Sequence, residues 1–291
     1  MPKTTYLKSF TFPSNEQDSG FCGSIQRSAY DSFYPFGVLS SRGLRYVEFE
    51  PVTIFYGGNG SGKTTALNVI AEKTGVQRGS VYNKSNFFPD YVKLCQVDTL
   101  SYVPRCSRII TSDDVFDYML DMRNYNQAVD RRRDKVFMEW VEYTDPFAPA
   151  WNFGGMEDYD ELKLRVNAKK QTQSRYTRDR LGVKNVIDGS NGETAFRYFV
   201  EKIGDGGLYL LDEPENSLSP SRQLELVKFM EESARFFECQ FIISTHSPFL
   251  LAMKDAKIYD LDSDPARVRQ WTELENVRAY RDFFKEREGE F

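Results

Sequence analysis

A glycine-rich segment at residues 57–64 constrains the fold of this chain more than any other feature. It reads Gly-Gly-Asn-Gly-Ser-Gly-Lys-Thr, which fits G-x-x-x-x-G-K-[ST], and it follows an apolar run at 52–56. Residues 63–73 then have helical spacing. Glycines permit positive φ and leave room for backbone N–H groups to wrap phosphates at a helix N-terminus. The segment therefore predicts a strand–loop–helix unit that binds the phosphates of a nucleotide.

Two side chains of this loop have distinct expected tasks. Lys63 places a positive charge between the β- and γ-phosphates, and the Thr64 hydroxyl reaches Mg²⁺. ATP and Mg²⁺ are therefore the expected ligands. The predicted nucleotide-binding residues of the loop are Gly57, Gly58, Asn59, Gly60, Ser61, Gly62, Lys63, Thr64 and Thr65.

A second apolar run, at residues 208–211, ends in two adjacent acids, Asp212 and Glu213. The run predicts a buried parallel strand, so both carboxylates are expected where that strand meets the nucleotide. Burying a carboxylate without a partner is costly, and a metal ion and a water molecule supply the two partners. We expect Asp212 to hold Mg²⁺, directly or through water, and Glu213 to polarise the attacking water.

Two further segments complete the set. Another apolar strand is expected at 241–244. The only histidine of the chain, His246, comes two residues after it, following Thr245. Residues 190–193 read Ser-Asn-Gly-Glu at the start of a helix expected over 191–203. A serine hydroxyl, a bare glycine N–H and a helix N-terminus together make an anion site.

In their order along the chain (57–64, 190–193, 208–213 and 241–246), the four segments resemble the ABC-type ATPases, and within them the soluble branch of SMC, RecF and overcoming-lysogenisation-type proteins. The resemblance covers about residues 34–261 and is closest to small single-domain bacterial ATPases of the AAA/ABC kind. It includes the tetrad Asp-Glu-Pro-Glu at 212–215, the run at 217–223 and the ending at 273–278. The resemblance implies an α/β P-loop NTPase fold: an ABC-type ATPase head with a parallel-sheet core, N-terminal antiparallel strands and a helical insertion.

The resemblance also implies roles for particular residues. His246 is expected to contact the γ-phosphate and to act catalytically with Glu213 and Lys63. Ser190 and Gly192 are expected to read the γ-phosphate of an ATP molecule that the opposite subunit holds. The loop after the two acids runs along the partner subunit in the family, a role that falls here on Asn216, Ser217 and Leu218, although many relatives have Asp where this chain has Ser219.

Two family positions have only candidates in this chain. The family has a glutamine that touches Mg²⁺ and the water, and Gln96 is one candidate for it. The other candidate is Asp113, which follows the strand expected at 108–111; by position we favour Asp113 in an equivalent polar role. By position, adenine stacking falls to Tyr34 or Phe36.

The element pattern predicts three parts. Residues 1–112 form the N-terminal lobe of the nucleotide-binding core, 113–185 a helical insertion, and 186–291 the C-terminal lobe with the signature, the two acids and the histidine. Residues 1–40 are expected to be irregular, with edge strands. Residues 46–49 and 52–56 are expected to pair as neighbouring strands.

Composition restricts the function classes. The four cysteines are scattered and there is a single histidine, which argues against a zinc site. No apolar stretch approaches ~20 residues and no signal pattern is present, so we expect a cytoplasmic protein without a membrane partner. A net charge of −5 argues against general coating of nucleic acid. Residues 163–184 carry eight basic residues against one acid, which is consistent with a solvated face, a nucleic-acid contact or a dock for an acidic partner.

The functional expectation is an ATPase that hydrolyses ATP between two copies of itself. Such a homodimer would act as an ATP-dependent switch on a separate partner or effector protein, and analogy suggests bacterial antiviral defence. A DNA-binding repair or SMC-like ATPase is the alternative, although the long heptad coiled coils of those proteins are absent from the sequence. A transporter subunit is less expected. A nuclease of the overcoming-lysogenisation type would need a second catalytic domain, and only about 45 residues follow His246.

Overall fold

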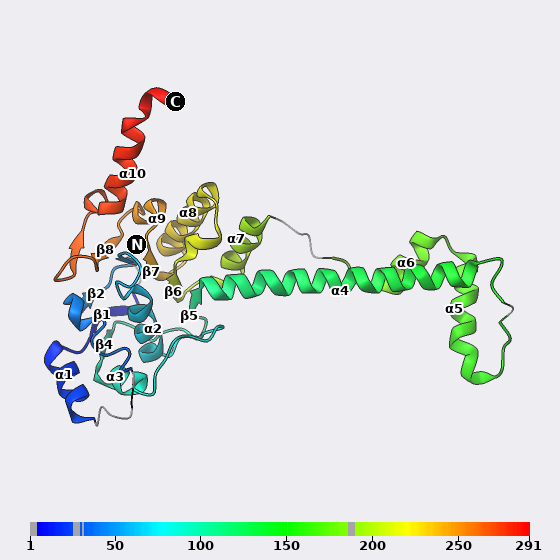
Figure 1. The fold of residues 1–291 in the computed structure, drawn as a ribbon, viewed down its shortest axis with the longest axis horizontal. Coiled ribbons are helices and arrows are strands. Elements are labelled where there is room, and N and C mark those ends of the chain that lie inside the picture. Colours follow the sequence, from blue (N-terminus) through cyan, green and yellow to red (C-terminus); the bar gives the residue numbers. More distant parts are fainter. Residues whose placement is uncertain (1–4, 26–29, 31, 150, 186–189) are drawn as a thin grey trace. The chain divides into compact units, whose positions relative to one another are not determined.

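The computed structural model describes residues 5–25, 30, 32–149, 151–185 and 190–291. The chain forms two compact units (Figure 1): Met1–Phe116 together with Asn191–Phe291 make the first, and Asp117–Ser190 make the second. The predicted α/β fold class is confirmed, because the first unit combines a largely parallel sheet with an antiparallel N-terminal sheet.

In the described part of the chain, a six-stranded sheet forms the centre of the first unit. Its order is β5-β6-β7-β3-β8-β9; neighbours from β5 to β8 pair parallel, and β9 pairs antiparallel with β8. Every residue of β3, β6 and β7 is buried, as expected of strands covered on both faces. The strands are Val52–Tyr56 (β3), Arg108–Thr111 (β5), Leu208–Asp212 (β6), Gln240–Thr245 (β7), Lys257–Asp260 (β8) and Arg267–Arg269 (β9).

The predicted pairing of residues 46–49 with residues 52–56 is wrong. Strand β2 pairs antiparallel with β1, which pairs antiparallel with β4, whereas β3 belongs to the six-stranded sheet. Their burial differs accordingly: β2 alternates exposed and buried positions, as a strand with one solvated face does, while β3 is buried throughout. The strands of this second sheet are Leu7–Thr11 (β1), Tyr46–Glu48 (β2) and Gln96–Thr99 (β4).

The N-terminal residues are more regular than expected. Strand β1 is the middle strand of its sheet, and helix α1 (Asn15–Ser24) follows it. A capping box starts this helix: the Ser14 hydroxyl accepts from the Gln17 N–H, and the Gln17 side chain accepts from the Ser14 N–H. The prediction of irregular structure and edge strands over residues 1–40 is therefore wrong for this stretch, and the Ser-x-x-Gln pattern is the signal that identifies the helix start.

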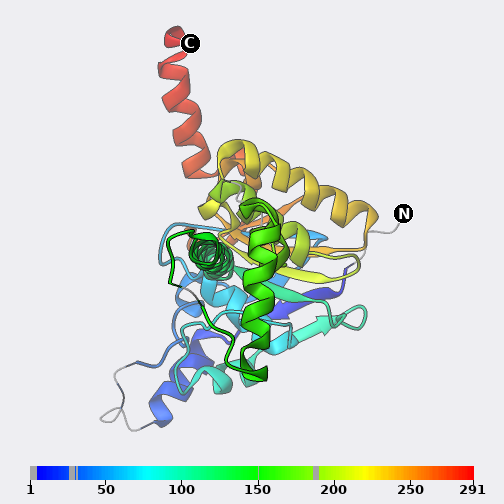
Figure 2. The ribbon, with the colours of Figure 1, turned by 90° about the vertical axis from the view of Figure 1, so that its right-hand side faces the viewer.

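Helices cover both faces of the six-stranded sheet. Leu67 and Ile70 of α2 pack in one core cluster with Leu210 and Ile242 of the sheet. Helix α8 contacts β7 and lies on the other side of the sheet from α2 (Figures 1 and 2). The helices of the first unit, within the described residues, include Lys63–Thr74 (α2), Phe88–Leu94 (α3), Asn191–Lys202 (α7), Pro220–Phe236 (α8), Pro248–Leu251 (α9) and Glu275–Glu286 (α10).

The buried side chain of Gln240 fixes the two sheets against each other. Its Oε1 accepts from the backbone N–H groups of Tyr6 and Leu7, both at 2.8 Å. Its Nε2 donates to the carbonyls of Leu7 at 3.0 Å and Glu50 at 3.3 Å. These contacts use the full hydrogen-bonding capacity of the amide. They hold β1 beside β7, the strand that leads to His246.

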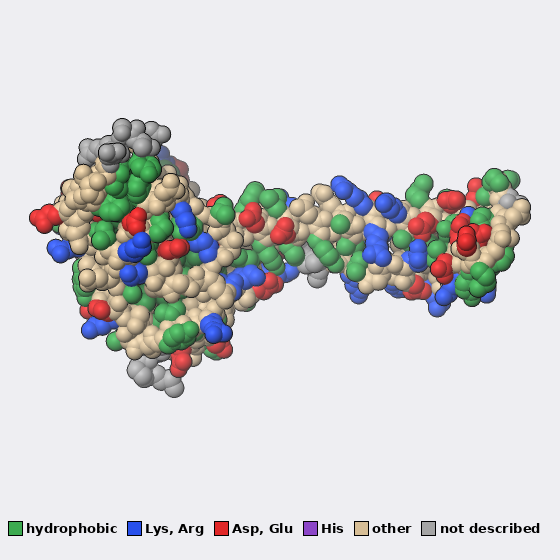
Figure 3. Space-filling model, turned by 90° about the horizontal axis from the view of Figure 1, so that it is seen from below, with side chains coloured by type: hydrophobic (Ala, Val, Ile, Leu, Met, Phe, Trp, Pro, Cys, Tyr) green, Lys and Arg blue, Asp and Glu red, His purple; other side chains and the backbone are tan. Residues whose placement is uncertain are grey.

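The second unit is helical. It contains most of α4 (Ser112–Thr144), with α5 (Tyr159–Lys170), α6 (Gln173–Leu181) and the short helix η3 (Met156–Asp158). Val136, Ala168 and Tyr176 form its small core. Trp140 Nε1 donates to the Ala168 carbonyl at 3.1 Å, which ties α4 to α5. Charged side chains of both signs lie along the surface of this unit (Figure 3).

The boundary between the two compact units lies inside α4, after Phe116. The first turn of α4 belongs to the first unit because Asp114 Oδ2 accepts from the Thr111 N–H at 2.8 Å and from the Thr111 hydroxyl at 2.9 Å. No helix in the described part of the chain combines the length and the apolar character that a bilayer span requires.

Candidate nucleotide-binding site

The glycine-rich loop joins β3 to α2 and lines a cavity of about 340 Å³. Gly60 and Gly62 adopt φ of 80° and 96°, which residues with a Cβ rarely adopt. Gly62 is the N-cap of α2, and no side chain caps this helix start. The first N–H groups of a helix have no partner within the helix, so they are donors for an anion in the cavity.

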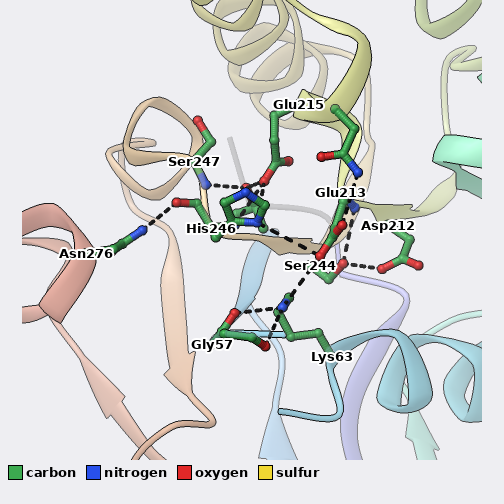
Figure 4. A network of polar contacts seen from close by, with 12 residues as sticks. Gly57, Lys63, Asp212, Glu213, Glu215, Ser244, His246, Ser247 and Asn276 are labelled. Carbon is green, nitrogen blue, oxygen red and sulfur yellow. Dashed lines mark hydrogen bonds and ion pairs between the residues drawn. The ribbon is translucent and has the colours of Figure 1, made fainter. Parts of the chain in front are cut away.

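Lys63 points back along the loop that precedes it. Its Nζ donates to the carbonyls of Gly57 at 2.7 Å and Gly58 at 3.0 Å (Figure 4). The same ammonium lies 3.6 Å from Glu213 Oε1, and the Lys63 side chain is 4% exposed. A buried cation held by neutral carbonyls beside the loop suits a triphosphate.

Asp212 stands at the carboxyl end of β6 and accepts two hydroxyl hydrogen bonds on one oxygen. Thr64 Oγ1 donates to Asp212 Oδ1 at 3.0 Å, and the Ser244 hydroxyl donates to the same atom. Burial raises the pKa of the Asp212 carboxyl, while these hydrogen bonds and Lys63 oppose the rise. A carboxylate and a hydroxyl side by side are the oxygen ligands that Mg²⁺ takes beside nucleotide phosphates, so both residues fit the predicted metal site.

Glu213 adopts a left-handed backbone conformation, with φ 47° and ψ 55°. Its N–H donates to the Ser244 carbonyl at 3.0 Å, and its Oε2 accepts from Asn216 Nδ2 at 3.0 Å. A non-glycine residue holds this conformation only when its surroundings enforce it. Here the turn directs the carboxylate toward Lys63 and His246 (Figure 4).

His246 lies over the two glutamates of the loop that follows β6. Its Nδ1 is 3.5 Å from Glu215 Oε1 and 3.9 Å from Glu213 Oε1, and its side chain is 49% exposed. The Glu215 carboxylate is buried, and its Oε1 accepts from the Thr245 hydroxyl at 2.6 Å and from the His246 N–H at 2.9 Å. Glu215 thus fixes the backbone from which the imidazole projects.

The segment at 190–193 lies apart from this cluster. Gly192, in the first turn of α7, lies beside the loop at 217–219, where an added Cβ would make ordinary contact with the Ser217 carbonyl oxygen at 3.8 Å. Glu193 Oε1 lies 3.1 Å from Arg222 Nη2 of α8. Ser190, which immediately precedes α7, is exposed. Among the described residues that line the cavity over the loop, neither Ser190 nor Gly192 occurs.

Of the remaining candidates, Asp113 and Tyr34 are beside the site. Both line a cavity of about 450 Å³ together with Thr64 and Asp212. The Tyr34 hydroxyl lies 3.1 Å from Thr65 Oγ1, and burial raises the pKa of Tyr34.

The other two candidates are placed differently. Gln96 lies exposed in β4 of the N-terminal sheet. Phe36 is 8% exposed and its ring stacks on Phe21 at a centroid distance of 4.3 Å, so it is not available to stack on an adenine.

Four residues that hold the site together have no role predicted from the sequence. The Ser244 hydroxyl donates to Asp212 and accepts from the Glu213 N–H. Gln223 accepts from the Ser247 hydroxyl and donates to the Leu218 carbonyl. Asp262 accepts from the Gly58 N–H at 2.8 Å. Asn276 donates to the His246 carbonyl. Only the run at 217–223 and the ending at 273–278 offered a signal, for Gln223 and Asn276.

A family model described as "AAA domain, putative AbiEii toxin, Type IV TA system" matches residues 190–252. This stretch contains Ser190, Gly192, Asp212, Glu213 and His246. The match confirms the predicted resemblance to ABC-type ATPases. The glycine-rich loop between β3 and α2 has the strand–loop–helix form of a phosphate-binding P-loop.

Solved structures with similarity to the chain include an Smc head domain with an extended coiled coil, bound to the C-terminal domain of ScpA, from Pyrococcus furiosus. It is 13% identical, with 83% of this chain and 95% of that chain covered and a TM-score of 0.38. A dimeric bacterial ABC transporter cassette is also 13% identical, with 78% and 88% covered and a TM-score of 0.35. A search of curated proteins gives no match.

The packing around Gly62 yields a prediction. In Gly62→Ala the new Cβ would lie 3.0 Å from Leu39 Cδ2 at a positive φ, whereas in Gly75→Ala, also at positive φ, it would meet nothing within 4 Å. Both variants should lose about 1–2 kcal/mol of unfolding free energy from backbone strain. Only Gly62→Ala should also weaken nucleotide binding, because it displaces the start of α2.

Chemical denaturation and titration with a fluorescent ATP analogue measure the two effects. Equal nucleotide affinity in the two variants would contradict the assignment of the cavity over this loop.

Proposed function

We propose that this protein binds ATP with Mg²⁺ and hydrolyses the ATP at a site shared by two copies of the chain. One observation carries the proposal. Lys63 and His246 both lie within 4 Å of the Glu213 carboxylate, and Asp212 accepts from Thr64 beside them, whereas Gly192 lies against the loop at 217–219. With the γ-phosphate bound beside Lys63 of one copy, the start of α7 in a second copy, at Ser190 and Gly192, would contact that phosphate from the other side.

Each residue has a task that its position supports. The N–H groups at the start of α2 and the Lys63 ammonium bind the phosphates. Thr64 and Asp212 would hold Mg²⁺, which when bound neutralises phosphate charge. Glu213 accepts a proton from the attacking water, and the Lys63 ammonium lies 3.6 Å from its carboxylate. His246, half-exposed at the rim, donates a hydrogen bond to the γ-phosphate.

The shared site also makes the ATPase a switch. Contacts from both subunits to one γ-phosphate favour a closed pair, and hydrolysis removes them. The helical unit at residues 117–190 is then the proposed surface through which the switch acts on a separate partner protein. A cytoplasmic role in bacterial antiviral defence is proposed by analogy alone.

A substitution at the proposed base tests the shared site. Glu213→Gln should lower kcat by about 10²–10⁴-fold, because the amide cannot accept the proton of the water. ATP should still bind, so a dimer should accumulate in gel filtration with ATP and Mg²⁺. Glu238→Gln is the matched control, since Glu238 also has a positive φ, 54°, but lies outside the site.

A monomer as the only species of Glu213→Gln with saturating ATP would contradict the shared site. Loss of ATP binding in this variant would contradict the role of Glu213 as a base.

Nucleic-acid binding by an SMC-like ATPase is the second candidate function. It is favoured by cations of the helical unit that are exposed and form no ion pair with another described residue. They are Arg131, Arg132, Lys135, Lys163, Lys169, Lys170, Arg178 and Lys184. Unpaired cations release counterions when they meet phosphates, which is the main source of such affinity.

A duplex DNA titration at several salt concentrations tests this candidate. Lys169→Glu with Lys170→Glu should weaken binding and reduce the slope of log Kd against log salt by about one unit for each lost contact. Absence of binding by the wild-type protein at about 50 mM salt would exclude the candidate.

A further inference from the structure

The C-terminal segment of the chain contacts both loops that carry the proposed phosphate-binding groups. Asp262, just after β8, accepts from the N–H of Gly58 in the glycine-rich loop at 2.8 Å. Asn276, in the first turn of α10, donates from Nδ2 to the carbonyl of His246 at 2.5 Å (Figure 4). The ending at 273–278, which the nucleotide chemistry leaves without a role, therefore lies against the histidine loop.

Both backbone polar groups of His246 are held by side chains. Glu215 Oε1 accepts the N–H at 2.9 Å, and Asn276 Nδ2 donates to the carbonyl. The orientation of the Asn276 amide follows from its partner, because a carbonyl only accepts and so must face the NH₂ group. These two side chains come from opposite directions along the chain, one from the loop after β6 and one from α10.

Asn276 itself is fixed at two points. Its backbone N–H donates to the hydroxyl of Tyr56 at 3.3 Å, and Tyr56 is the last residue of β3 before the glycine-rich loop. Leu274 and Val277 on either side are buried, which anchors the start of α10 in the first unit. A rigidly placed amide between Tyr56 and His246 thus sets the spacing of the two loops.

Each of these two side chains has one polar atom that is paired and one that is not. Asn276 Oδ1 and Glu215 Oε2 are buried and have no hydrogen-bond partner among the described residues. Buried polar atoms without partners are rare and call for an explanation. Each of these two side chains is therefore held through its other polar atom, which is the atom that contacts the His246 backbone.

We infer that Asn276 is a positioning residue for His246, through which α10 sets the geometry of hydrolysis. This inference rests on the proposed ATPase function. Asn276 contacts no nucleotide in this assignment; it acts by holding the His246 backbone so that the imidazole stands beside Glu213. Loss of the hydrogen bond should therefore slow the chemical step and leave nucleotide binding intact.

The test compares steady-state ATP hydrolysis of the full chain for wild type, Asn276→Ala and Asn276→Asp. Asp keeps the shape of the side chain but cannot donate to the carbonyl, so it replaces Ala if that variant does not fold. Both should lower kcat about 10-fold to 100-fold, with KM for ATP within about twofold of wild type. Arg281→Ala on the same helix is the control, since Arg281 is exposed and pairs with Asp282; its kcat should be unchanged.

A double-mutant cycle separates positioning from general destabilisation. If Asn276 acts through His246, then His246→Ala combined with Asn276→Ala should be no slower than His246→Ala alone. Two results would overturn the inference: a wild-type kcat in both Asn276 variants, or a double variant whose loss of kcat is the product of the two single losses. Neither result would affect the proposed ATPase function. A wild-type protein that binds ATP without hydrolysing it would remove the proposed function, and this inference with it.

Discussion

Strands β3, β6 and β7 lie side by side in a register that ends all three at one edge of the sheet. Tyr56 pairs with Thr245, and Asp212 pairs with Ser244. The next residues are Gly57, Glu213 and His246, so the phosphate loop, the proposed base and the histidine leave the sheet together. Carboxyl ends of parallel strands are where ligands bind in open α/β sheets. A shift of one residue in any strand would turn its side chains to the other face and separate these groups.

The sequence was informative where one physical rule decided the local structure. The glycine spacing fixed the loop, the continuous apolar runs at 208–211 and 241–244 fixed two buried strands, and serine–proline pairs marked the starts of α8 and α9. The sequence also identified the side chains proposed for catalysis and metal binding. Lys63 follows the glycine pattern of the loop, and Asp212, Glu213 and His246 each stand at or just after the end of an apolar strand, where purely structural packing does not require a charged or polar side chain. Their roles in catalysis remain predictions that the geometry supports.

Tertiary partners decided what the sequence could not. The short strand β2 reads like a partner of β3, yet it pairs with β1. The Gln240 side chain binds both the start of the N-terminal strand and the Glu50 carbonyl in the link from β2 to β3. Glu215 and Asn276 belong to segments some 60 residues apart, and only the fold brings both to His246. A contact of this kind leaves no periodic pattern in the chain. It follows from the hydrogen bond that ties the start of α10 to Tyr56, the last residue of β3.

The proposed site is complete only across two subunits, and a mixing experiment tests this most directly. Lys63→Ala would disable the loop half of each site, and Ser190→Arg the half that a partner contributes. Each variant alone should be inactive, but a random mixture should form pairs with one intact site and recover about one quarter of wild-type hydrolysis. A mixture as inactive as its two components, under conditions where they dimerise, would contradict a nucleotide site built from two copies of this chain.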